Sequence, residues 1–464
     1  MIPGIRSSIV LLVCHFVFLP RVYCQHVSTR LQKGLNAAKE GNCEEALPEL
    51  KAAAAANPRI ETALNAIAMC ETRLGHPDLA TESFLRVTEL MPGAWHAWNN
   101  LGANYLALGR PDRAVAALQR AVKLNRRAPS AWSNLGQALD DLGNNEEAFR
   151  AFDRARLLDG HNAQTLAIWQ RVAEELATKA GDQIESKHYE RARALLLETQ
   201  GALERSASWN NLLGYAEFKL GHHAPALEHL QRAVHLDPDR EEYVLDLGEF
   251  LLAFRADEAA RQVFETGHKK MPGSRRIQFG LAVTYEVQGR ESAAIELLNG
   301  LITSRPSFRP AFNALGRSYE MTGQWASMIE LGKTLQTEDA SSALAWYLIG
   351  AGLFGHFARD SGSLEESISA LKRSLSLDSS SSQAHFVLGK AYEQQRSLKL
   401  AVSELRETVR LDPTHNRAHY VLGRVYEKLG ERELAKHELA IHKNNLEHHA
   451  QDSLRLLVTE STSR

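Results

Sequence analysis

Residues 95–128, WHAWNNLGANYLALGRPDRAVAALQRAVKLNRRA, contain an order of large, small and turn-forming residues that returns along most of the chain. The landmarks of this stretch are Trp98, Leu101, Gly102, Tyr105, Gly109, Ala114 and Ala121. A step of 34 residues from these landmarks gives the matching set Trp132, Leu135, Gly136, Leu139, Gly143, Ala148 and Ala155. Self-similarity at a fixed period of this length is typical of a fold built from stacked repeats.

The repeat frame covers more than nine-tenths of the 464 residues. With position 1 at Val27, twelve units start at residues 27, 61, 95, 129, 163, 207, 241, 275, 309, 343, 382 and 416, and the last ends near residue 449. Position 20 is alanine in ten units: Ala46, Ala80, Ala114, Ala148, Ala192, Ala226, Ala260, Ala294, Ala401 and Ala435. Position 32 is proline in six units: Pro58, Pro92, Pro238, Pro272, Pro306 and Pro413.

Each unit has the pattern of two helices joined by a turn. Positions 4, 7, 8 and 11 share one face of a first helix at the 3.6-residue period, and positions 20, 24 and 27 share one face of a second helix. A pair such as Leu108-Gly109 ends the first helix, because glycine takes the left-handed conformation that closes a helix. Proline at position 32 ends the second helix. We therefore predict an all-α fold whose helix pairs bury their apolar faces by stacking on their neighbours.

The landmarks resemble the tetratricopeptide repeat, whose pattern W-x2-L-G-x2-Y, A-x3-F-x2-A and P is largely carried by Trp98 to Ala121. In this unit Leu118 stands for the Phe and Arg126 for the Pro. The resemblance covers residues 27–449 and implies a right-handed superhelical solenoid with a concave groove lined by the first helices. It also implies a role as an adaptor or assembly scaffold for peptides and other proteins.

Several places depart from the frame. Unit five is ten residues too long, which predicts an extended first helix or a longer turn, and unit ten has five extra residues around residues 354–357. Unit nine carries Met328 and Gly332 where Ala and a large apolar residue are usual, and Trp209 is one place out of frame. After the last unit, residues 450–464 are amphipathic, which predicts a capping helix and tail.

Residues 1–24 have the features of a cleaved signal peptide, with an apolar run at residues 9–19 and a cut expected after Cys24. The run is shorter than the ~20 residues that span a bilayer, and no second run of spanning length follows. An uncleaved anchor, a lipid anchor at Cys24 and a chance apolar start are the alternatives. A bacterial lipoprotein signal normally places Leu and two small residues before the Cys, whereas Arg-Val-Tyr occupies residues 21–23. We therefore predict export to the periplasm or the secreted space, with no membrane span after cleavage.

Charge and motifs argue against nucleic acid and against catalysis. Lys plus Arg number 54 and Asp plus Glu number 56, so the net charge of −2 comes without the clustered basic surface that nucleic acid requires. The chain lacks the phosphate-binding, nucleophile-elbow and HExxH motifs, as well as a paired CxxC. Of the 19 histidines, the adjacent pairs His222-His223 and His448-His449 point in different directions on a helix, and His437 and His442 are five residues apart, one more than the i, i+4 spacing of a zinc site. We therefore predict no catalytic residue, no metal, no cofactor and no small-molecule substrate.

Two cysteines remain after removal of the predicted signal peptide. Cys43 lies near the turn of unit one, and Cys70 lies toward the end of the first helix of unit two, at the same edge of neighbouring layers. In an oxidising compartment they form a possible disulfide. The alternative is a pair of small buried thiols.

Positions 2, 5, 9 and 12 of the first helices form a stripe beside the packing face, which we call the first-helix stripe. Its N-terminal half is rich in amides, with Asn99 and Asn211 at position 5. Asn100 and Asn134 at position 6 match only two positions of the asparagine ladder of a repeat-bearing glycosyltransferase, and no transferase domain follows them. Its C-terminal half is aromatic and basic: Phe279, Arg317, Tyr347, Phe386, Lys390, Tyr420 and Arg424. Aromatic residues and Arg anchor protein interfaces, so we predict these residues as partner-binding candidates. The C-terminal half is expected to grip an acidic segment; alternatively, Phe279, Phe386 and Tyr420 partly fill gaps between repeats.

Two functions fit this pattern. The first is a protein–protein interaction scaffold or adaptor of the cell envelope or secreted space, which binds partner polypeptides in the groove. The second is a periplasmic chaperone-like carrier for an exported polypeptide or a polymer-export complex. An enzyme is not expected, because no motif and no spare domain is left for one.

Overall fold

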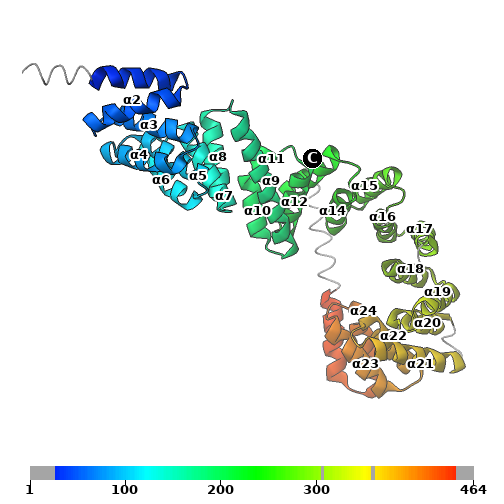
Figure 1. The fold of residues 1–464 in the computed structure, drawn as a ribbon. Helices are drawn as coiled ribbons and strands as arrows, with labels where there is room; N and C mark the ends of the chain where they lie inside the picture. The colour runs from blue at the N-terminus through cyan, green and yellow to red at the C-terminus, as the bar shows by residue number, and fades with distance from the viewer. Residues whose placement is uncertain (1–26, 305–307, 357–360, 446–464) are drawn as a thin grey trace, which may run out of the picture. The chain divides into compact units, whose positions relative to one another are not determined.

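A computed structural model describes residues 27–304, 308–356 and 361–445 of the chain (Figure 1). Every regular element in these three ranges is a helix, and none is a strand. The same ranges contain no helix that is both long and apolar enough to cross a lipid bilayer. The predicted signal peptide at residues 1–24 and the predicted capping helix at residues 450–464 lie outside them.

Two compact units, Met1–Ala233 and Val234–Arg464, divide the chain, and each is a stack of helix pairs. In the first unit a helix over residues 27–39 pairs with α2 (Cys43–Ala56). The pairs that follow are α3 (Glu61–Arg73) with α4 (Pro77–Leu90), α5 (Trp95–Ala107) with α6 (Pro111–Leu124), and α7 (Pro129–Asp141) with α8 (Asn145–Leu158). The remaining helices are α9 (Ala163–Glu185), α10 (Tyr189–Glu198), α11 (Gln200–Leu203), α12 (Ala207–Lys219) and α13 (His223–Leu236), which ends just past the division.

The second unit continues the same alternation. Its first three pairs are α14 (Glu241–Ala253) with α15 (Asp257–Lys270), α16 (Arg275–Val287) with α17 (Glu291–Ser304), and α18 (Arg309–Thr322) with α19 (Trp325–Glu338). They are followed by α20 (Ala343–His356) with α21 (Ser361–Leu377), α22 (Ser382–Gln394) with α23 (Leu398–Leu411), and α24 (Asn416–Leu429) with a helix over residues 432–445. The first helices begin where the repeat frame starts its units. The prediction of an all-α solenoid of helix pairs is confirmed.

Glycine closes the first helix at the turn of most pairs. Gly109 has a positive φ of 63°, which places it in the left-handed region. The N–H of Gly109 donates to the carbonyl of Leu106, and the N–H of Arg110 donates to the carbonyl of Tyr105, both at 2.9 Å. These two bonds are those of a Schellman motif, so the Leu-Gly landmark has the structural role that the sequence predicted for it.

Small residues at position 8 let the two helices of a pair touch. A Cβ atom added to Gly136 would lie 2.9 Å from each of three atoms of the Phe152 ring, which belongs to position 24 of the same unit. A Cβ atom added to Gly102 would lie 2.4 Å from Cγ of Leu118, again at position 24. Contact between positions 8 and 24 therefore fixes the packing face of the first helix, and the first-helix stripe lies beside that face.

Unit nine keeps this packing by a different route. A Cβ atom added to Gly332 would lie 2.7 Å from Cγ1 of Ile349 and 2.9 Å from the carbonyl oxygen of Ala345, so α20 lies directly against the backbone of α19. Because position 24 has no side chain here, Leu348 of α20 fills the space over Gly316 at position 8, with its Cδ2 2.4 Å from an added Cβ. The side chain that the frame lacks is supplied by the next unit.

The excess length of unit five lies in its first helix. α9 has 23 residues, whereas α7 has 13, so the extended-helix alternative is the one that the structure contains. The second helix is shortened in turn, because α10 has only 10 residues and the single turn of α11 follows it. Trp209 packs into the core beside this break, and its Nε1 donates to the carbonyl of Leu196 at 2.9 Å. The extra residues of unit ten fall partly on residues 357–360, outside the described ranges.

In six units, position 4 joins the first helix to the end of the preceding unit. The side chain there places a nitrogen within hydrogen-bond distance of the backbone carbonyl six residues earlier. These side chains are Trp98, Trp132, Asn210, Gln278, His385 and His419, with distances from 2.7 to 3.3 Å. Residues as different as Trp, Gln and His are tolerated at position 4 because each supplies an apolar body and one N–H group.

Cys43 and Cys70 are free thiols that share the core formed by the first two helix pairs. Burial and the side-chain hydrogen bond with Cys43 raise the pKa of Cys70 to about 12. No disulfide joins these two residues, and a hydrogen bond between their side chains takes its place. The structure therefore contains the alternative of two small buried thiols.

Candidate functional site

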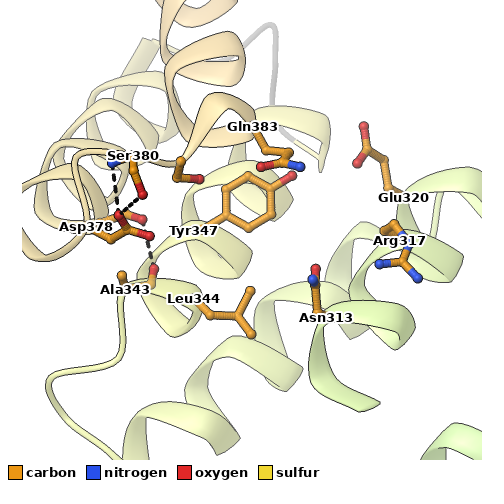
Figure 2. Close-up of a pocket in the computed structure, with 11 residues that line it drawn as sticks. Asn313, Arg317, Glu320, Ala343, Leu344, Tyr347, Asp378, Ser380 and Gln383 are labelled. Carbon is orange, nitrogen blue, oxygen red and sulfur yellow. Dashed lines mark hydrogen bonds between the residues drawn. The ribbon is translucent and has the colours of Figure 1, made fainter. Parts of the chain in front are cut away.

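A pocket of about 470 Å³ opens in the first-helix stripe of the second unit, where α18, α20 and α22 meet (Figure 2). Its lining includes positions 5, 9 and 12 of unit nine, positions 2 and 5 of unit ten, and position 2 of unit eleven. These residues are Asn313, Arg317, Glu320, Leu344, Tyr347 and Gln383. Stripe positions from three successive units thus surround one cavity.

Tyr347 lies in the middle of this pocket, between Asp378 on one side and Arg317 on the other (Figure 2). Burial raises the pKa of Tyr347, so its hydroxyl stays neutral at physiological pH. Asp378 is held in place by the hydroxyl and the N–H of Ser380, at 2.6 and 2.9 Å, and these hydrogen bonds lower its pKa. The pocket therefore combines an aromatic centre with a fixed carboxylate, which suits one side chain of a bound polypeptide.

Arg317 already has a partner in the chain. Its Nη2 donates to Oε2 of Glu286 at 2.9 Å, and the other oxygen of Glu286 accepts from the hydroxyl of Ser318 at 2.7 Å. The cation predicted at position 9 of unit nine is thus neutralised by the preceding unit. It shapes the wall of the pocket and adds little net charge to it.

A second cluster continues the stripe toward α24. The ammonium of Lys390 lies 5.0 Å from the ring centre of Phe354 and 5.4 Å from that of Phe386. The guanidinium of Arg417 lies 5.9 Å from the Phe386 ring, and the His415 ring lies 4.6 Å from it, centre to centre. We call Phe354, Phe386, Lys390 and Arg417 the Lys390 cluster. Its members again occupy stripe positions 12, 5, 9 and 2.

Tyr420 is the most accessible aromatic residue among those predicted. It is 43 % exposed, with the Arg424 guanidinium 5.8 Å and the His442 ring 5.2 Å from its ring centre. Phe386 at the same position of the preceding unit is only 7 % exposed and belongs to the core. Phe279 packs edge-on against Phe308 at 5.5 Å. The gap-filling alternative therefore describes Phe279 and Phe386, whereas Tyr420 presents its ring to solvent.

The amides of the first unit are bonded to one another. Nδ2 of Asn100 donates to Oδ1 of Asn65 at 3.1 Å, and Nδ2 of Asn134 donates to Oδ1 of Asn99 at 3.0 Å. Each bond links position 6 of one unit to position 5 of the unit before it. Asn211, in contrast, is buried. The predicted asparagine ladder therefore serves the contacts between repeats, which leaves fewer amide groups for a ligand.

The over-long α9 borders a further pocket in the first unit, of about 660 Å³. Its lining includes the apolar residues Ala177, Leu203 and Leu212 and the charged residues Glu174, Asp182, Glu185 and Arg205. Acidic side chains outnumber basic ones in this lining, whereas the Lys390 cluster is basic.

The sequence did not single out Phe354 or Arg417. Both occupy stripe positions, 12 and 2, so the repeat frame contained the signal, but position 12 of unit ten lies next to the extra residues. Within the described ranges, no group of three His, Cys, Asp or Glu side chains is arranged to hold a metal ion.

Comparison with known proteins gives two findings. The family described as tetratricopeptide repeat matches residues 31–95, 99–162, 179–241, 211–267 and 353–416, more than half of the chain. No curated protein sequence matches the chain.

Solved structures with a similar arrangement of helices include yeast Tom70, with a TM-score of 0.45 and 12 % identity over 88 % of this chain and 97 % of that one. For the APC/C hetero-tetramer Cut9-Hcn1 the TM-score is 0.41, with 13 % identity over 90 % of this chain and 93 % of that one. For YrrB, described as a TPR protein with an unusual peptide-binding site, the TM-score is 0.31, with 22 % identity over 43 % of this chain and 98 % of that one.

Proposed function

The chain belongs to the tetratricopeptide repeat family, and we propose that it is a non-enzymatic scaffold that binds partner polypeptides along the first-helix stripe of its second unit. The observation that carries this proposal is the run of aromatic and cationic side chains on successive first helices. Tyr347 stands in the pocket, Lys390 and Arg417 follow, and Tyr420 with Arg424 ends the run. Tyr and Arg are the side chains that most often dominate the binding energy of protein interfaces.

The stripe suits an extended segment better than a small molecule. The pocket of about 470 Å³ has room for a side chain, and the neighbouring cluster offers a second contact one repeat farther along. A ligand that touches both must cross from one unit to the next. A polypeptide does this with alternate side chains, because successive residues of an extended chain point to opposite sides.

Copurification from the protein's own cells tests this proposal. We expect the wild-type chain to retain a stoichiometric partner that the double variant Tyr420→Ala/Arg424→Gln loses, since both substitutions remove accessible contacts. Leu400→Ala is the matched control, because Leu400 is 50 % exposed on the second helix α23. An unchanged partner yield in the double variant, with an unchanged circular-dichroism spectrum, would contradict the proposal. Many substoichiometric unfolded clients would favour a carrier.

The proposed compartment is the cell envelope or the secreted space. It is supported by the apolar run and cleavage pattern of residues 1–24. Amino-terminal sequencing of the protein from culture medium or an osmotic-shock fraction tests it. We expect a chain that begins at Gln25; an intact amino terminus in the cytoplasmic fraction would contradict export.

A further inference from the structure

The cations on or next to the first-helix stripe of α18, α22 and α24 fall into two groups. Arg317 is paired with Glu286 at 2.9 Å, and Lys428 is paired with Glu393 at 2.6 Å. Lys390, Arg417 and Arg424 have no carboxylate within ion-pair distance among the residues that the structure describes. These three lie on α22 and α24, at stripe positions 9, 2 and 9. The stripe therefore places uncompensated positive charge where the proposed partner is bound.

Lys390 is also partly withdrawn from water. Its ammonium lies between two ring faces, 5.0 Å from the centre of Phe354 and 5.4 Å from that of Phe386, and the Arg417 guanidinium approaches the second ring. Burial, followed by repulsion from Arg417, lowers the pKa of Lys390. The rings offset only part of the lost hydration, because a cation over an aromatic face gains about 0.5–2 kcal/mol. An anion between Lys390 and Arg417 would relieve both the repulsion and the lost hydration.

We propose that Lys390 and Arg417 form the binding site for a carboxylate of the bound polypeptide, so that the scaffold selects acidic segments. The half-buried Phe354 ring forms the wall along which the aliphatic part of a Glu or Asp side chain lies. This inference rests on the proposed function and names the chemical class of its partner.

The charge balance of this site favours a carboxylate over a phosphate. Glu320 and Glu393 lie near enough for their charges to act on Lys390, so the surplus positive charge is small. A single carboxylate charge matches a small surplus, whereas a phosphate group, which carries about −1.5 to −2 at neutral pH, exceeds it. The tetratricopeptide clamp for a chain-terminal carboxylate is a different arrangement, since its Lys and Asn residues at positions 5 and 9 are absent here.

Fluorescence anisotropy with the full chain and short labelled peptides tests the inference. The probes are one peptide of alternating Glu and Leu, one with Gln for Glu, one with Lys for Glu, and one with phosphoserine for Glu. We expect the Glu peptide to bind about tenfold or more tightly than the Gln peptide, as one charge-assisted contact provides. Lys390→Gln/Arg417→Gln should remove this preference and leave the affinity for the Gln peptide unchanged.

Two further variants separate charge from structure. Lys390→Arg keeps the charge and should keep the preference. Lys372→Gln is the matched control, because Lys372 lies 5.7 Å from the Tyr392 ring but belongs to the second helix α21. It should bind all peptides as the wild type does.

Several results would overturn the assignment. They are equal affinity of the wild type for the Glu and Gln peptides, tighter binding of the phosphoserine peptide, or an equal loss in Lys372→Gln. If the Glu and Gln peptides bind equally and both lose affinity in Tyr420→Ala, the acid preference is wrong but the proposed polypeptide-binding function is retained. Self-association of the wild type that excludes the Glu peptide would assign the site to a second copy of the chain and overturn the proposal.

Discussion

The ammonium of Lys390 lies 5.0 Å from the ring centre of Phe354, although the two residues belong to different repeat units. Lys390 is on α22 and Phe354 is on α20, one layer earlier in the stack. The contact exists because position 9 of one unit faces position 12 of the unit before it. Stacking in register thus builds a candidate binding surface that no single unit contains, and its consequences for stability, pH dependence and binding can be measured.

Substitution at position 8 should show how closely the two helices of a pair approach. Gly136→Val places new atoms inside the contact with the buried Phe152 ring, which an added Cβ would already approach to 2.9 Å. We expect the free energy of unfolding to fall by about 1–3 kcal/mol, as in other overpacked cores. Urea unfolding followed by circular dichroism measures this change. Gly93→Val is the control, because no atom lies within 4 Å of an added Cβ there, and an equal loss in both variants would contradict the packing argument.

Restoring the usual large residue in unit nine should destabilise the protein. Gly332→Leu agrees with the repeat pattern, but its Cβ would lie 2.7 Å from Ile349 and 2.9 Å from the backbone oxygen of Ala345. Leu348 already fills the space over Gly316. We therefore expect a loss of about 1–3 kcal/mol in the free energy of unfolding, measured by urea titration. A more stable Gly332→Leu variant would mean that α20 is free to move away from α19.

His385 should stabilise the protein most on the acid side of neutrality. The hydrogen bond with Glu404, at 2.6 Å, raises the pKa of His385 above its usual 6.5. A raised pKa adds stability that is complete below 6.5 and is lost as the pH rises through the folded-state value. We expect His385→Gln to lower the free energy of unfolding by about 1 kcal/mol at about pH 6 and by less at about pH 8.5. A larger loss of unfolding free energy at the alkaline pH than at the acid pH would contradict a raised pKa of His385.

His415 should act in the opposite direction. Burial lowers its pKa, Arg417 and His419 add to this, and Asp412 opposes them. Its Nδ1 also accepts the Ala418 N–H at 3.1 Å, which a protonated ring cannot do. The wild type should therefore lose stability as the pH falls below 6.5, and His415→Asn, which retains a cap, should lose less. Urea midpoints of both proteins at about pH 5 and about pH 8 measure this difference. An equal change of the midpoint between the two pH values in both proteins would contradict the expectation.

The thiol pair should resist alkylation in the folded protein. The pKa of Cys70 is raised to about 12, and both side chains are buried, so little reactive thiolate is available. We expect iodoacetamide to modify Cys43 and Cys70 slowly in buffer and rapidly in urea, as measured by mass spectrometry of the peptides that contain them. Rapid modification in buffer would show that the first two helix pairs open. Detection of a Cys43–Cys70 crosslink would favour the disulfide instead.

The helix pairs could be predicted from the sequence because their determinants lie within single units. Gly109 ends its helix by its own conformation, and Gly136 meets Phe152 sixteen residues later in the same unit. The replacement of the missing side chain at Gly332 by Leu348 was not predictable in this way, since the compensating residue comes from the next unit.

The candidate binding surface was predictable in position but not in detail. The stripe positions could be identified, yet position 5 is buried at Phe386 and 43 % exposed at Tyr420, a difference that depends on how neighbouring units pack. The neutralisation of Arg317 by Glu286 and the pairing of Asn100 with Asn65 likewise join residues of adjacent units. Periodicity gives the direction of a side chain, whereas its partners depend on three-dimensional contacts.

Site-specific photocrosslinking tests most directly whether the first-helix stripe of the second unit binds a polypeptide. A photoreactive phenylalanine analogue is placed at Tyr347, at Tyr420 and, as a control, at the exposed Leu400 of α23. We expect the photoreactive residue at positions 347 and 420 to crosslink to one protein in the cells of origin, and the residue at position 400 to give no crosslink. Crosslinks from Leu400 alone would contradict it, because they would place the partner on the second helices.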